Sequence, residues 1–129
     1  MKEILLFGCR DKRDVQILKN IFVLQAVGIK LIEKKQYGLP ISLLTEEGKA
    51  DNGITPGMLE EYTGSELKVP VMVLAGFSVE ELDSALALIR QKLTGSFYLK
   101  AILTEHNRNW NILLLSKHLQ EEHRKMIGQ

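Results

Sequence analysis

Residues 71–77 read VMVLAGF, an apolar run that ends near a glycine, and residues 4–9 read ILLFGC in the same way. A helical pattern follows each run, and a second apolar run that ends in Leu-Thr-Glu follows each helical pattern. These second runs are ISLLTEE at 41–47 and KAILTEHNRNW at 100–110. Because apolar runs that alternate with helical periodicity are typical of strand–helix–strand units, the sequence predicts an internally duplicated β-α-β unit.

Periodicity and turn residues set the bounds of the expected elements. Ser78 and Glu81 are spaced as in a capping box, which predicts the start of a helix, and Gly28 predicts the end of the first helix. Asn107 or Asn109 is expected to cap the last helix. The expected helices cover 14–27, 56–62, 79–93 and 110–126, and the expected strands cover 3–9, 29–34, 41–44, 69–76 and 98–104.

These elements predict an α+β fold. Duplicated β-α-β units most often form a ferredoxin-like, four-stranded antiparallel sheet with two helices on one face, here with an added C-terminal helix. The alternative is a three-layer α/β fold with a mostly parallel sheet, and in both folds the runs at 3–9 and 70–76 are central neighbours. We expect a single domain over 1–129, made of halves 1–45 and 69–110, a connector 46–68 and a C-terminal helix 110–126.

Composition narrows the class of protein. The chain has 129 residues, of which 45% are hydrophobic and 26% charged, as in ordinary globular proteins. Its apolar runs fall short of the ~20 residues that span a bilayer, and no signal-peptide pattern precedes the first strand. The single cysteine cannot form an internal disulfide, so a reducing cytoplasm is expected. A net charge of +1 gives no general attraction to nucleic acid or membranes, and neither is expected as a partner.

The first candidate site is the polar turn that follows the last expected strand. Its candidate contact residues offer hydrogen-bonding groups and an aromatic ring for a planar ligand or a partner's backbone, and loops in this position commonly carry binding function. The alternative is a capping turn in which Asn109 begins the last helix and an aromatic ring covers the edge of the core. The candidate contact residues are Thr104, His106, Asn107, Arg108 and Trp110.

The second candidate site follows the first strand. Cys9 lies at a strand end, next to Arg10, Lys12 and Arg13. A helix start and nearby cations favour the thiolate, which is the nucleophilic form, and the same cations make an anion site possible. The alternatives are that Cys9 is a small buried apolar residue and that the charged loop is simply solvated.

The spacing of the remaining polar residues does not indicate a metal site or a catalytic site. The three histidines, His106, His118 and His123, do not form a zinc-binding pattern. No nucleophile elbow and no paired carboxylates for acid–base catalysis are present. We therefore expect no metal, no cofactor and no catalytic residues.

The second half of the chain resembles a known family. VPVMVLAGFSVEELDSALALIRQKL at 69–93 and LKAILTEHNRNWNILLLSKHLQEEH at 99–123 are similar to a bacterial domain of unknown function, family 3783. The similarity covers roughly residues 69–123. It implies a small bacterial intracellular protein, and the family has no established activity or catalytic residues to transfer to this chain.

Together these observations favour a non-enzymatic module that binds a small molecule or a protein through the turn from Thr104 to Trp110. A homodimer formed through a sheet face or edge fits the expected fold. The alternative is a thiol-dependent enzyme or redox sensor that uses Cys9. If the turns after Thr45 and Thr104 lie side by side, we expect one composite pocket between them.

Overall fold

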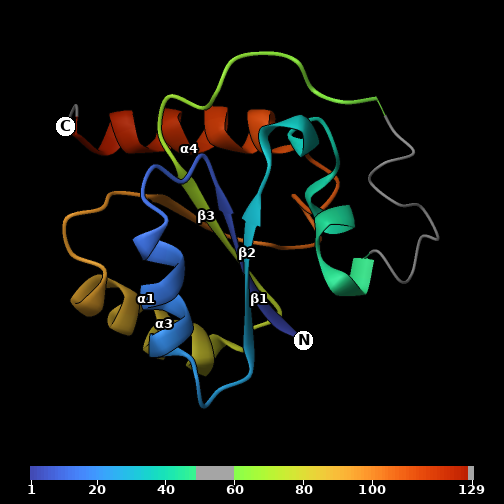
Figure 1. Cartoon of the computed structure of the whole chain (residues 1–129). Helices are drawn as coiled ribbons and strands as arrows, with labels where there is room; N and C mark the ends of the chain where they lie inside the picture. The colour runs from blue at the N-terminus through green and yellow to red at the C-terminus, as the bar shows by residue number, and fades with distance from the viewer. Residues whose placement is uncertain (49–59, 128–129) are drawn as a thin grey trace.

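A four-stranded sheet forms the centre of the molecule (Figure 1). The computed structural model describes residues 1–48 and 60–127; part of the connector and most of the expected helix at 56–62 lie outside these residues. The strands are β1 (Lys2–Phe7), β2 (Val27–Ile32), β3 (Val71–Ala75) and β4 (Leu99–Ile102). Their order is β2-β1-β3-β4, so the two apolar runs are central neighbours, as predicted.

The direction of the strands differs from both expected folds. β1 pairs in parallel with β2, β3 pairs in parallel with β4, and the two pairs meet through an antiparallel contact between β1 and β3. The α+β class is confirmed, but the ferredoxin-like topology is not, because its sheet is fully antiparallel. The alternative, a three-layer fold with a mostly parallel sheet, agrees with two of the three strand pairings but not with the antiparallel contact between β1 and β3. In each half the helical crossover returns the chain to the adjacent position, where parallel pairing is possible.

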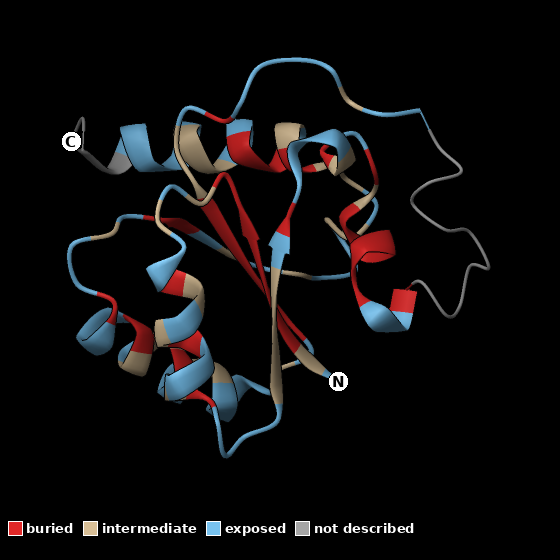
Figure 2. Ribbon diagram, in the orientation of Figure 1, coloured by how far each residue is buried: buried red, intermediate tan, exposed pale blue. Residues whose placement is uncertain are grey.

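Helical segments cover both faces of the sheet. Side chains alternate along a strand, so Ile4 and Leu6 of β1 point to one face while Leu5 and Phe7 point to the other. The first face packs against α1 (Arg13–Ile21) and α3 (Val79–Lys92). The second packs against α4 (Ile112–Ile127) and the 3-10 helix η2 (Ile41–Leu44), which follows the short η1 (Lys34–Gln36). Figure 2 shows the resulting continuous burial of β1 and β3.

The first helix is shorter than predicted. α1 ends at Ile21, not at 27, and the apolar side chains of Val23 and Leu24 are 73% and 92% exposed. The chain turns at Ala26, which has a φ of 54°, and Gly28 lies inside β2 and does not cap the helix. Pairing of β2 with β1 from Val27 onward therefore overrides an apolar pattern that would have continued the helix.

Residues 41–44 form a 3-10 helix and not the predicted strand. All four of its residues are buried, which explains why the run is uniformly apolar. The last helix is also capped differently, since Asn111 accepts a hydrogen bond from the Leu114 N–H at 2.9 Å. The capping box of α3 is confirmed, because Ser78 and Glu81 exchange both hydrogen bonds.

Candidate functional site

The turns that follow Thr45 and Thr104 lie side by side. The backbone N–H of Ile41 donates to the Trp110 carbonyl at 2.9 Å, and that of Ser42 donates to the Arg108 carbonyl at 3.0 Å. The first N–H groups of a helix have no partner within the helix, so η2 uses the turn after β4 to satisfy them. These two bonds join segments that are far apart in the sequence.

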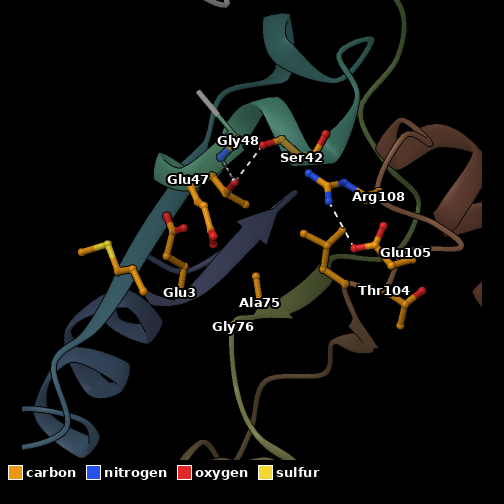
Figure 3. Close-up of a pocket in the computed structure, with 12 residues that line it drawn as sticks. Glu3, Ser42, Glu47, Gly48, Ala75, Gly76, Thr104, Glu105 and Arg108 are labelled. Carbon is orange, nitrogen blue, oxygen red and sulfur yellow. Dashed lines mark hydrogen bonds and ion pairs between the residues drawn. The ribbon is translucent and has the colours of Figure 1, made fainter. Parts of the chain in front are cut away.

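A pocket of about 260 Å³ lies between the two turns (Figure 3). Ala75 and Gly76, at the end of β3, also line it. The carboxyl ends of strands are a common position for ligand sites in sheets that carry helical crossovers. The polar residues that line the pocket are Glu3, Ser42, Thr45 and Glu47 from the first half and Thr104, Glu105 and Arg108 from the second.

A buried carboxylate lies at one side of the pocket. Glu3 is 1% exposed although it belongs to β1. Its two oxygens accept from the Glu46 N–H at 3.3 and 3.2 Å, and its carboxylate lies 3.3 Å from the Lys30 ammonium. Lys30 also pairs with the Glu46 carboxylate at 2.5 Å. Burial of a charge requires such partners, so this network fixes the start of the turn after Thr45.

The turn after Thr45, whose residues 46–48 are helical, is tightly packed. The Thr45 hydroxyl donates to the Ser42 carbonyl at 2.7 Å and accepts from the Gly48 N–H at 3.0 Å. A Cβ at Gly48 would overlap the Ser42 carbonyl, so only glycine fits there. The Ser42 side chain is itself 4% exposed, and its hydroxyl makes no hydrogen bond to the residues that the structure describes.

The turn after β4 is shaped by Asn107. Its side-chain oxygen accepts from the Thr104 N–H at 2.9 Å, and its side-chain NH₂ donates to the Ile102 carbonyl at 3.1 Å. Asn107 therefore supports the turn and is not among the residues that line the pocket. Arg108 does line it, with its side chain 37% exposed and paired at 3.2 Å with Glu105, whose side chain is 91% exposed.

The aromatic candidates lie outside the pocket. The ring centroid of Trp110 is 5.2 Å from that of His106 and 4.7 Å from that of His118 on α4, and Trp110 also packs against the core. Of the five contact residues predicted for this turn, the pocket therefore brings together Thr104 and Arg108 alone.

Four polar residues that line the pocket from the first half of the chain were not among the predicted sites. Glu3 carries the clearest sequence signal, because it is the one charged position within EILLF, a run that is otherwise apolar. Thr45 and Glu47 belong to the repeated Leu-Thr-Glu segment and its extension. Ser42 gives no such signal, because 41–44 has the pattern of a strand.

The cations around Cys9 are engaged elsewhere. The Arg10 guanidinium donates to the carbonyls of Gly8 and Leu67 at 2.5 and 2.7 Å, and Arg13 pairs with Asp11 at 2.8 Å. Lys12 is exposed to solvent. The candidate thiol and anion residues therefore do not converge on one point.

Cys9 belongs instead to a polar network at the start of α1. Its sulfur lies 3.2 Å from the Tyr98 hydroxyl, which donates to the carboxylate of Asp14 at 2.7 Å. The Asp14 carboxylate also accepts from the Ser96 hydroxyl at 3.0 Å. Burial raises the pKa of Tyr98 well above its usual value, and the hydrogen bonds to Cys9 and Asp14 raise it further. The network links α1 to the segment before β4.

The described residues contain no group of three or more His, Cys, Asp and Glu side chains placed to hold a metal ion. Within the same residues, the helices are too short or too polar to cross a membrane.

One of three comparisons with known proteins gives a match. No curated protein and no solved structure matches the chain. Residues 70–126 match the family described as a domain of unknown function (DUF3783), which confirms the resemblance noted in the sequence. This segment runs from β3 to α4 and supplies Thr104, Glu105 and Arg108 to the pocket. The similarity to DUF3783 thus covers residues 70–126, less than half of the chain.

Proposed function

We propose that the protein is a non-enzymatic module that binds a small polar molecule in the pocket between the turns after Thr45 and Thr104. The observation that carries this proposal is the pair of hydrogen bonds from Ile41 and Ser42 to the turn after β4. They hold segments of the two halves around one space, which neither half encloses alone.

The chemistry of the pocket supports a small, polar ligand. Its volume of about 260 Å³ lies just below the ~300–1,000 Å³ that is typical of small-molecule sites. Hydroxyl groups and charges of both signs line it, together with the backbone around two glycines. Neither cysteine nor histidine is among the lining residues, which favours binding over nucleophilic catalysis.

A second candidate function is the binding of a protein partner at the turn after β4. His106 is exposed and packs edge-on against Trp110 outside the pocket, so a protein that recognises this turn would contact these rings first. The Cys9 alternative has less support, because Arg10 and Arg13 pair with other groups. The proposal retains the expectation of a cytoplasmic bacterial protein, in which the free thiol of Cys9 would stay reduced.

The test is an NMR titration of the ¹⁵N-labelled protein with small metabolites grouped as anions, cations, zwitterions and neutral compounds. We expect at least one group to cause saturable shifts of the amides of Gly48, Gly76 and Thr104. Arg108→Ala should weaken these shifts, whereas Arg90→Ala, on the exposed face of α3, should leave them unchanged. If no group shifts these amides, the pocket is not a ligand site.

A further inference from the structure

The charges of the pocket are separated. Glu3 and Glu47 lie on one side of it in Figure 3, and Arg108 lies on the other with Glu105. The first pair comes from β1 and the turn after η2, and the second comes from the turn after β4. A ligand that fills the pocket therefore meets a carboxylate side and a guanidinium side at the same time.

On the carboxylate side, Glu47 supplies the available charge. Glu3 is compensated by Lys30 and by the Glu46 N–H. Glu47 is exposed, lines the pocket, and makes no hydrogen bond or ion pair with the residues that the structure describes. A ligand ammonium at this position gains an opposite charge, whereas a ligand carboxylate would be repelled.

On the opposite side, Arg108 has unused donors. A guanidinium carries five N–H donors, and one hydrogen bond, to Glu105 at 3.2 Å, is formed within the described residues. Because the Glu105 side chain is 91% exposed, this pair contributes little and is easily exchanged for a ligand carboxylate. The guanidinium can bind such a carboxylate through two parallel hydrogen bonds.

The hydroxyl of Ser42 is a further donor at the pocket. Ser42 is 4% exposed, lines the pocket, and its backbone N–H binds the Arg108 carbonyl. Its hydroxyl forms no hydrogen bond to the described residues. Because no buried side-chain oxygen of the described residues lacks a hydrogen-bond partner, the Ser42 hydroxyl oxygen is reached by solvent, and it can donate to a ligand carboxylate held by Arg108.

We propose that the ligand is a small zwitterion of the amino-acid type, with its ammonium group at Glu47 and its carboxylate at Arg108 and the Ser42 hydroxyl. This inference rests on the proposed function and names its ligand class. A simple amine would leave Arg108 without an anion, and a simple carboxylate would leave Glu47 without a cation. The zwitterion pairs both charges and brings no net charge of its own.

The experiment compares ligands that share a carbon chain. γ-Aminobutyrate is titrated beside butylamine and butyrate, and β-alanine beside propylamine and propionate, with glycine as the shortest zwitterion. Binding is followed by the amide shifts of Gly48 and Thr104 and by calorimetry. We expect the best zwitterion to bind about tenfold or more tightly than either of its matched single-charge compounds, as the loss of one charged hydrogen bond predicts.

Two variants assign each charge to its partner. In Glu47→Gln, the zwitterion should bind no more tightly than its matched carboxylate, and in Arg108→Gln no more tightly than its matched amine. Glu122→Gln and Arg90→Gln remove the same charges from exposed helix positions and should preserve the full preference.

The outcomes separate this inference from the proposed function. If an amine or a carboxylate binds at the pocket amides as tightly as every zwitterion, the ligand class is wrong and the binding function stands. If no zwitterion shifts the pocket amides, the inference is also wrong. If, in addition, none of the four metabolite groups shifts them, the proposed function fails as well.

Discussion

At the scale of single residues, two neighbouring asparagines distinguish structural from binding roles in the turn after β4. Asn107 exchanges hydrogen bonds with the backbone of Thr104 and Ile102, whereas Asn109 is exposed and makes no hydrogen bond within the described part of the chain. We expect Asn107→Ala to lower the free energy of unfolding by about 1–2 kcal/mol and Asn109→Ala to change it by less than about 0.5 kcal/mol. Urea denaturation measures both, and equal losses would contradict the structural role of Asn107.

The site could be predicted from the sequence only in part. Thr104 and Arg108 were identified because a polar loop that follows a strand is a common binding position. Trp110 was assigned to the same site, but its ring turns toward His118, a neighbour contributed by α4 that a local pattern does not contain. Glu47 reaches the pocket because η2, which covers one face of the sheet, is hydrogen-bonded to the turn after β4. A run of four apolar or hydroxyl residues does not indicate a 3-10 helix.

At the scale of elements, the start of α3 depends on ionisation. Glu81 lies 2.6 Å from the Lys2 ammonium and closes the capping box with Ser78. The ion pair with Lys2 and then the Ser78 N–H lower the pKa of Glu81 from 4.5 to about 2. Because the folded-state pKa is below that of the unfolded chain, the ionised group stabilises the fold above pH 4.5, and this contribution is lost as the pH falls toward about 2.

Glu81→Gln tests this contribution, because glutamine preserves the capping box but removes the charge. We expect the variant to be less stable than the parent at pH 7, and the difference in unfolding free energy to shrink between pH 4.5 and pH 2. Glu80→Gln, one position earlier and without an ion pair to a described residue, should show a smaller pH-dependent difference. A Glu81→Gln difference that is constant with pH would contradict the assignment.

The first or last residue of a helix could be predicted only where hydrogen bonds between residues close in the sequence determine it. The capping box fixes the start of α3 through two hydrogen bonds between residues that are close in the sequence. The end of α1 has no such local cause, since Val23 and Leu24 would extend an apolar stripe. The chain leaves the helix there because Val27 must reach Lys2 in the sheet, and this tertiary requirement is not visible in a single segment.

At the scale of the whole molecule, the central strand pairing explains why the sheet is mixed. In the sequence, aligning Gly8 with Gly76 also aligns Leu5 with Val73. In the sheet, these same two residues are partners. A twofold axis that passes through this pair would relate the halves and make β1 and β3 antiparallel, as an internal duplication predicts. The repeat predicts two similar units, but the sequence does not contain the position of the axis, and frequency alone favours the ferredoxin-like topology.

The antiparallel pairing of β1 with β3 predicts that residues 70–126, the segment that matches DUF3783, do not fold by themselves. Residues 70–126 include β3, whose residues from Val71 to Leu74 are at most 1% exposed. Removal of the first half would uncover the edge of β3 that pairs with β1 and would also remove η2 and α1 from the two faces of the sheet. An uncovered apolar strand of this kind cannot remain in water as a stable edge.

We therefore expect a fragment of residues 70–126 to show no cooperative thermal transition and a poorly dispersed NMR spectrum, whereas the whole chain shows both a transition and dispersion under the same conditions. Addition of a peptide of residues 1–48 should restore part of the dispersion, because it supplies β1 and η2. A fragment that unfolds cooperatively alone would show two folding units and would contradict the single-domain organisation that the sequence predicts. The proposed pocket depends on the same result, since Glu47 and Ser42 reach Arg108 only when both halves form one sheet.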